Sequence, residues 1–163
     1  MIEFNDEYFM YMALRQAELA FDAGEVPIGA IAVKDGQILA RAYNQVEMLN
    51  DATAHAEILV MTQAAAALKD WRLSDVDIYV TKEPCAMCAG AMVNARVKRV
   101  IFGSSDNKYG ACGGALNVVQ FEGMLHQVEV KKDVLEFECT ELIKLFFQRV
   151  RQKKGHSGKK SEE

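Results

Sequence analysis

The chain has 163 residues, half of them apolar and 26% charged, which is ordinary globular usage and enough for one domain with a core. No apolar run approaches the roughly 18 residues of a membrane span, and the acidic N-terminus lacks a signal-peptide pattern, so we expect a cytoplasmic protein with no membrane partner. The four cysteines are then expected to be reduced.

The net charge of −4 excludes a uniformly basic nucleic-acid-binding surface, but the charge is unevenly distributed. Residues 148–163 hold six Lys or Arg and two Glu, a net charge of +4, which leaves −8 on the rest of the chain. A basic end of this kind is expected either to meet an anion such as RNA or to be a solvated, disordered tail. We expect one domain over residues 1–152 and a basic, disordered tail over residues 153–163.

In chain order, a helix is predicted from Asn5 or Asp6, which can cap it, to about Ala23, with Gly24 ending it. Two strands follow, and Asp35-Gly36 between them is typical of a two-residue hairpin turn. Residues 45–53 are expected to be a polar loop. The remaining predicted helices cover about residues 54–68, 85–94 and from 133 onward, and the predicted strands cover residues 28–33, 38–43, 77–81, 97–102 and 127–130.

This order predicts an α/β protein with one mixed five-stranded sheet between helices on both faces, a three-layer α/β/α arrangement. The strands at 77–81 and 97–102, joined through the helix at 85–94, should be parallel. A loop at 103–114 contains four glycines and is expected to shape a pocket.

Two cysteines lie at the start of one predicted helix, in Pro84-Cys85-Ala86-Met87-Cys88. Residues three apart share a helix face, so both sulfurs can face one metal ion. His55 and Glu57 lie at the start of another predicted helix. Three protein ligands with an open fourth position are typical of catalytic zinc. We therefore predict that His55, Cys85 and Cys88 bind one zinc ion per chain and that Glu57 is the acid–base group beside it.

Other interpretations of these residues remain open at this point. A pair of cysteines three apart is also found in structural zinc sites and redox centres. A glutamate in a first helical turn also stabilises the helix dipole.

The combination of His55-Ala56-Glu57 with Pro84-Cys85-Ala86-Met87-Cys88 matches the signature of zinc nucleobase deaminases. Further matching segments extend over nearly the whole chain, and with them the sequence resembles the bacterial tRNA-specific adenosine deaminases, within the zinc-dependent cytidine/deoxycytidylate deaminase family. The principal segments are Val26-Pro27-Ile28-Gly29-Ala30, Asn44, Tyr79-Val80-Thr81, Asp106, Lys108-Tyr109-Gly110-Ala111 and Phe146-Phe147.

The resemblance implies a cytidine deaminase-like fold and a homodimeric hydrolase that converts adenosine to inosine at the wobble position of a tRNA anticodon stem-loop. It implies that Glu57 moves protons between the attacking water, the ring nitrogen and the leaving ammonia. Asn44, which is also common as a turn residue at a strand end, would hydrogen-bond the nucleoside. The substrate contacts expected from the resemblance, besides Asn44, are Ala54, Val26, Ile28, Pro84, Asp106 and Phe147.

The chain departs from the family pattern between Ser104 and Leu125, and again at Lys82 on the rim of the expected pocket. These departures leave the chemistry intact but bear on RNA recognition. Two other functions therefore stay as alternatives: a deaminase of free guanine, cytosine or a nucleoside, and a catalytically inactive zinc module that binds RNA.

Overall fold

A computed structural model describes residues 4–157 of the chain, which form a five-stranded mixed sheet with helices on both faces, as predicted. The strand order is β2-β1-β3-β4-β5; β1 is antiparallel to β2 and β3, whereas β3, β4 and β5 are parallel. The strands are β1 (Gly29–Lys34), β2 (Gln37–Tyr43), β3 (Asp77–Lys82), β4 (Arg99–Ser104) and β5 (Glu129–Lys131).

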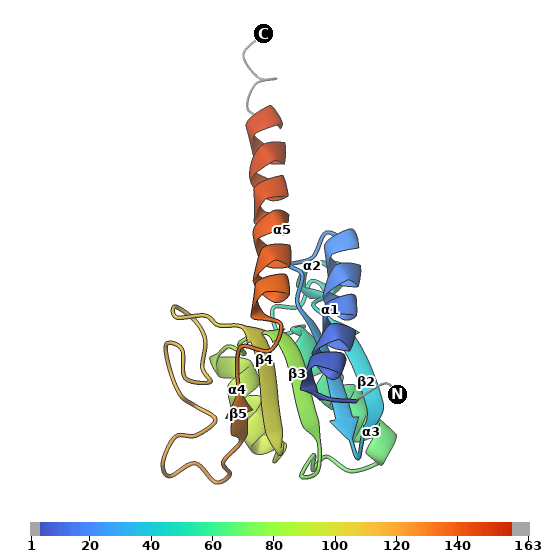
Figure 1. Cartoon of the computed structure of the whole chain (residues 1–163), viewed down its shortest axis with the longest axis vertical. Helices are drawn as coiled ribbons and strands as arrows, with labels where there is room; N and C mark the ends of the chain where they lie inside the picture. Colours follow the sequence, from blue (N-terminus) through green and yellow to red (C-terminus); the bar gives the residue numbers. More distant parts are fainter. Residues whose placement is uncertain (1–3, 158–163) are drawn as a thin grey trace.

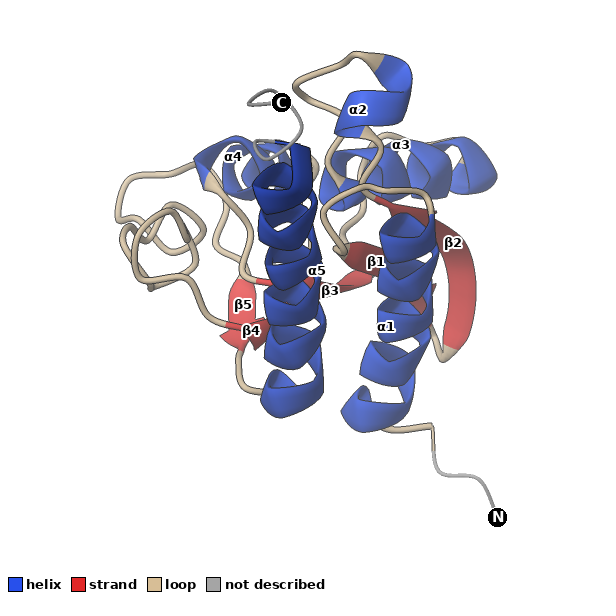
Figure 2. Cartoon of the chain, turned by 90° about the horizontal axis from the view of Figure 1, so that it is seen from above, coloured by secondary structure: helices blue, strands red, loops and turns tan. Residues whose placement is uncertain are grey.

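Helices α1 (Asp6–Asp22) and α5 (Glu136–Ser157) cover one face of the sheet, and α3 (Ala56–Leu68) and α4 (Ala86–Asn94) cover the other. Two apolar clusters fill the spaces between the layers, one around Phe9, Tyr79 and Ile101 under α1 and α5, the other around Val60 and Met92 under α3 and α4. The expected three-layer arrangement is therefore confirmed (Figures 1 and 2).

Local signals account for most element boundaries. The Asn5 side chain accepts a hydrogen bond from the Tyr8 amide at 3.0 Å and so caps α1. Asp35 and Gly36 have φ angles of 50° and 72°, as a type I′ hairpin turn requires. At Gly29 a Cβ atom would collide with the backbone of α1 at Ala13, so glycine allows this helix to approach β1 closely.

Several element boundaries differ from the prediction; strand β5, for example, begins two residues later than predicted, at Glu129. A four-residue helix, α2 (Val46–Leu49), lies in the expected polar loop. Strand β4 begins two residues later than predicted. Helix α5 begins at Glu136 rather than at residue 133, because Asp133 and Leu135 have φ angles of 64° and 52°, outside the helical range.

The last helix also extends farther than predicted. Residues 153–157, which we assigned to a disordered tail, continue α5, while residues 158–163 lie outside the described part of the chain. The end of this helix projects beyond the sheet (Figure 1) and is polar and basic. Disordered tails have the same composition, so the sequence alone does not distinguish a projecting helix from a disordered tail. The division of the chain at residue 152 stays a prediction.

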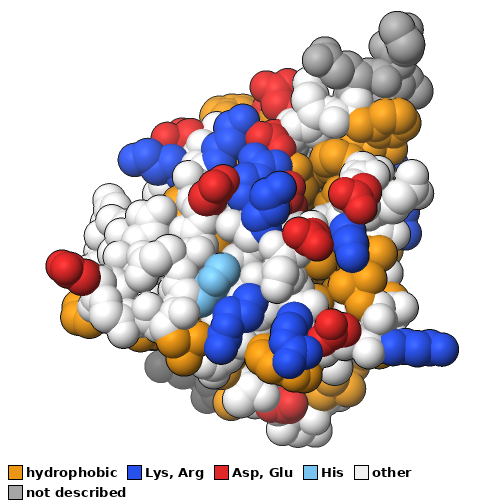
Figure 3. All heavy atoms as spheres, turned by 90° about the horizontal axis from the view of Figure 1, so that it is seen from below, with side chains coloured by type: hydrophobic (Ala, Val, Ile, Leu, Met, Phe, Trp, Pro, Cys, Tyr) orange, Lys and Arg blue, Asp and Glu red, His pale blue; other side chains and the backbone are white. Residues whose placement is uncertain are grey.

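The opposite end of the molecule carries mixed charge. In Figure 3, which views the end away from the projecting turns of α5, Lys and Arg side chains are interspersed with Asp and Glu. Asp6 is the centre of an ion-pair network and accepts hydrogen bonds from Arg99 at 3.1 Å, from Lys131 at 2.7 Å and from the Tyr79 hydroxyl at 2.6 Å. This network ties α1 to three strands. No helix in residues 4–157 is both long and apolar enough to span a bilayer.

Candidate active site

The two predicted metal-binding segments begin two neighbouring helices on the same face of the sheet. His55 is the N-cap residue of α3 and Cys85 is the N-cap residue of α4, both with extended backbone angles. Neither side chain forms a capping hydrogen bond with its own helix. Both side chains are consequently available to point toward each other in front of the two helix starts.

The three predicted ligands form one cluster. The His55 Nδ1 atom lies 3.6 Å from Cys85 Sγ and 3.5 Å from Cys88 Sγ, and the three donor atoms all lie within 4.8 Å of one another. Donors around a tetrahedral zinc ion, with bonds of about 2.0–2.3 Å, are about 3.5 Å apart. An imidazole and two thiols with this spacing fit zinc in both chemistry and geometry.

Glu57 lies in the first turn of α3, with only 4% of its surface exposed. Among the described residues, the compact group of potential metal donors contains His55, Cys85 and Cys88 but not Glu57. Burial raises the pKa of the Glu57 carboxyl above its usual range. A hydrogen bond with Cys88 and the charge of His55 act in the opposite direction, but burial outweighs them. A buried carboxyl group outside the ligand set is suited to moving protons.

In the metal-free cluster the two cysteines titrate in opposite directions, because the hydrogen bond between them raises the pKa of the Cys88 thiol and lowers that of Cys85. Hydrogen bonds from Cys88 and then from His55 lower the pKa of the Cys85 thiol to about 3, so this sulfur is a thiolate at neutral pH. The hydrogen bond with Cys85 in turn raises the pKa of His55. A thiolate is the form of cysteine that binds metal, and the proton on the imidazole would be released when a metal binds.

A cavity of about 210 Å³ opens beside His55 and Glu57. Its wall includes three of the predicted substrate contacts, Val26, Ile28 and Asn44. The Asn44 Nδ2 atom donates to the Val26 carbonyl at 3.3 Å, whereas its Oδ1 atom is buried and has no hydrogen-bond partner. A buried acceptor without a partner, lining a cavity, is the group that a donor on a ligand would satisfy.

The sequence as a whole is similar to known deaminases. A model of the MafB19-like deaminase family matches residues 4–151. The chain is 48% identical to a tRNA-specific adenosine deaminase of Bacillus subtilis, over 91% of this chain and 92% of the relative. The chain belongs to the tRNA-specific adenosine deaminase family. A second member, from Aquifex aeolicus, is 43% identical over 89% of this chain and 95% of its own length.

The fold of this deaminase also matches a solved structure from a study of A-to-I editing by tRNA:A34 deaminases at the wobble position. The TM-score is 0.80 at 42% identity, covering 83% of this chain and 98% of that one. The cytidine deaminase-like fold and the assignment as a deaminating enzyme, both expected from the sequence, are confirmed.

The other predicted substrate residues of the deaminase are not among those that line this cavity. Ala54 is buried, and its carbonyl accepts from the Gln45 amide. Pro84 is buried next to Cys85. Asp106 is ion-paired with Lys82 at 3.1 Å, and Phe147 is a half-exposed residue of α5 whose ring contacts Phe146. Their roles stay predictions.

Sequence reasoning missed two buried carboxylates at this site. Glu25 is 1% exposed and lines the cavity. Its carboxylate accepts hydrogen bonds from the amides of Glu47 and Met48 at 3.2 and 2.6 Å, and so caps α2 from outside the helix. Glu83, directly before the Pro84-Cys85 turn, is 4% exposed. The position of Glu83, a charged residue between an apolar strand and the metal-binding motif, could have indicated its role. The sequence around Glu25, in the connector before Pro27, has no comparable feature.

Proposed function

We propose that the protein is a zinc-dependent hydrolase that converts adenosine to inosine at the wobble position of a tRNA anticodon. The observation that carries this proposal is the meeting of three donors, His55, Cys85 and Cys88, beside a cavity that also exposes the non-ligand carboxyl of Glu57. The relatives named tRNA-specific adenosine deaminase support the choice of adenosine in tRNA over a free base.

His55, Cys85 and Cys88 would hold the ion. When bound, zinc supplies the Lewis acidity that makes water a nucleophile near neutral pH. Glu57 accepts a proton from the water that attacks C6 of adenine and delivers protons to the ring nitrogen and to the leaving amino group, so that water is consumed and ammonia released. Burial, which raises the pKa of Glu57, makes its protonated form accessible during this transfer.

Asn44 would orient the nucleoside. Its unpartnered Oδ1 atom accepts a hydrogen bond from the substrate, and its Nδ2 atom is held by the Val26 carbonyl, which fixes the direction of the amide. Val26 and Ile28 contribute apolar wall on the same side. A single nucleotide from a loop suits a cavity of about 210 Å³, because loop bases unstack at little cost.

We also infer a homodimer. Three large apolar side chains between residues 116 and 125, those of Leu116, Phe121 and Leu125, are each more than half exposed, and Met87 on α4 is 37% exposed. Apolar groups collected on one stretch favour burial in an interface. Sedimentation equilibrium should give twice the chain mass for the wild type and a smaller mass for Phe121→Asp; a monomeric wild type would remove this part of the proposal.

The deciding experiment is incubation with an anticodon stem-loop that carries adenine at the wobble position, with inosine and ammonia measured. Parallel reactions contain free guanine, free cytosine and adenosine. Inosine in the stem-loop alone supports the proposal, whereas ammonia from a free base would establish the small-molecule alternative. A tRNA substrate agrees with the cytoplasmic location expected from the sequence.

A further inference from the structure

The segment from Asp106 to Gly114 is shaped around the carboxylate of Glu83. Glu83 Oε1 accepts from the Asp106 amide at 3.1 Å, and Oε2 accepts from the amides of Cys112 at 3.1 Å and Gly114 at 2.9 Å. In this stretch the structure shows only an isolated bridge between Cys112 and Asn117 as sheet pairing. A buried carboxylate that receives three amides therefore replaces regular secondary structure in holding the segment.

The close fit around this carboxylate explains two glycines. A Cβ atom at Gly110 would collide with the Glu83 carboxylate, and one at Gly114 would collide with that carboxylate and with the Asp106 carbonyl. The Ala111 amide also donates to the Pro84 carbonyl at 2.8 Å. The segment is thus attached to the turn that carries the zinc ligand Cys85.

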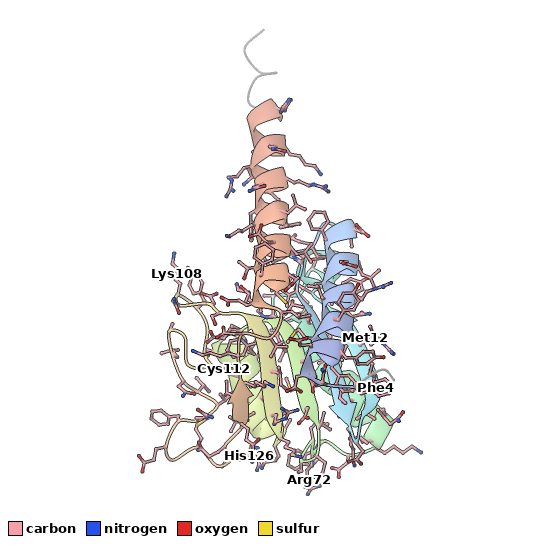
Figure 4. All side chains as sticks on the ribbon, viewed as in Figure 1. Phe4, Met12, Arg72, Lys108, Cys112 and His126 are labelled. Atoms are coloured by element: carbon pink, nitrogen blue, oxygen red, sulfur yellow. The ribbon has the colours of Figure 1, made fainter. Side chains whose placement is uncertain are left out.

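The outer side of this segment presents groups that suit a nucleic acid. Asp106 Oδ1 accepts from the amides of Lys108 and Tyr109, both at 2.9 Å, and this turn leaves Tyr109 65% exposed with the Lys108 ammonium 5.3 Å from its ring. Lys108 points away from the body, at the end of the molecule from which α5 projects, whereas Cys112 lies deeper in the segment (Figure 4). An exposed aromatic ring beside a cation provides stacking for a base and charge for a phosphate.

We propose that Glu83 is a positioning residue for the RNA substrate. It holds the Asp106–Gly114 segment against the Cys85 turn, so that Lys108 and Tyr109 contact nucleotides next to the target adenosine. Glu83 touches neither the substrate nor the three donors, and it acts through the segment. This inference rests on the proposed function, because a free base would not reach Lys108 or Tyr109.

The test uses Glu83→Gln in the full chain, which keeps the size of the side chain but places an amide nitrogen against backbone N–H groups. We expect KM for the wobble-adenine stem-loop to rise about tenfold or more, with kcat changed less than about threefold and zinc content unchanged. Hydrogen exchange at the amides of Asp106, Cys112 and Gly114 should become faster. Glu18→Gln, an exposed glutamate on α1 far from this segment in the sequence, is the matched control and should behave as wild type.

Gly114→Ala is a second variant that leaves Glu83 in place and disturbs the same contact. It should give the same rise in KM. The KM of the double variant should be no higher than that of the more impaired single variant, because both changes break the same interaction. If Glu83→Gln does not fold, Gly114→Ala alone decides the question.

An unchanged KM in a folded variant whose three amides exchange faster would overturn the inference. A loss of kcat or zinc at unchanged KM would also overturn it, since Glu83 would then support the ligand turn and not the RNA-facing segment. A wild-type protein inactive on the stem-loop would refute the proposed function itself, and that result is distinct from an active wild type with unaffected variants.

Discussion

His55 Nδ1 lies 3.5 Å from Cys88 Sγ, although 33 residues separate the two in the sequence. Two helix starts on one face of the sheet create this contact, and Cys85 completes the group. A metal ion held by this group would depend on side chains at the starts of both helices.

Removal of one donor should therefore remove the metal. His55→Ala and Cys88→Ala should each lower the zinc content from about one per chain to less than about one tenth, measured by inductively coupled plasma mass spectrometry. Cys112→Ala is the control, because Cys112 is a buried thiol outside the cluster, and it should keep its zinc. Full zinc in Cys88→Ala would mean that the ion is held elsewhere.

Glu57→Gln should separate metal binding from chemistry. The glutamine preserves size but cannot carry the proton, so deamination should fall by roughly 10²- to 10⁴-fold while the zinc content stays at the wild-type level. Steady-state ammonia release and metal analysis on the same sample measure both quantities. Parallel loss of metal would make Glu57 a ligand, and undiminished activity would exclude it as the proton carrier. An inactive wild type would instead favour the RNA-binding module.

Asn44→Ala should weaken substrate binding, because it removes both the buried acceptor and the donor held by Val26. We expect kcat/KM for the stem-loop to fall by roughly tenfold or more. Asn94→Ala, at the exposed end of α4, is the control. Equal kinetics for the two variants would show that Asn44 is only a turn residue at the end of β2.

Truncation after Gln152 should test whether the end of α5 meets RNA. It removes four lysines and two glutamates. If the lysines bind phosphates, the stem-loop affinity should fall, and the slope of log K against log salt should become shallower by about 0.7 for each phosphate that is no longer neutralised. Fluorescence anisotropy at several salt concentrations measures this slope. An unchanged slope would show that these residues do not bind RNA and are only a solvated end of the chain.

Asp6 should make the fold sensitive to acid. Burial acts to raise the pKa of its carboxyl, but hydrogen bonds from Arg99, Lys131 and Tyr79 outweigh burial and hold the pKa well below its usual range. Because the folded-state pKa is depressed, the carboxylate stabilises the fold at pH values above its unfolded pKa of about 3.9, and this stabilisation is lost as the pH falls through the lower, folded-state pKa.

Asp6→Asn should accordingly lower the free energy of unfolding at pH 7 by on the order of 1–2 kcal/mol, and the difference from wild type should shrink progressively below about pH 4. Urea unfolding across this pH range measures the difference. Asp75→Asn, at an exposed position, should show no such pH dependence. A constant difference down to pH 2 would contradict the role of the Asp6 charge.

The residues of the cluster were predictable because each part had a local signal. A histidine followed by two cysteines three residues apart has few functions other than metal binding. Both segments also have the features of helix starts, and two helices on the same face of the sheet bring their starts close together. The sheet was predictable because its three central strands are largely apolar and Asp35-Gly36 fixes the hairpin.

The parts that the sequence did not predict depend on distant partners. Helix α2 has four residues, too few for a helical repeat, and it receives its cap from Glu25, which lies more than 20 residues earlier. The Asp106–Gly114 segment likewise takes its shape from Glu83. Interactions between residues so far apart leave no periodic trace in the sequence, so both appear only once the chain is folded.

The short strand β5 has a consequence for self-association. It contributes three residues, Glu129–Lys131, to one border of the sheet, and two of them are charged. Such a border offers few free backbone groups to another chain and repels apolar strands. Strand-to-strand association between copies is thus discouraged at this border, so any such pairing would have to use the opposite border, the seven-residue strand β2.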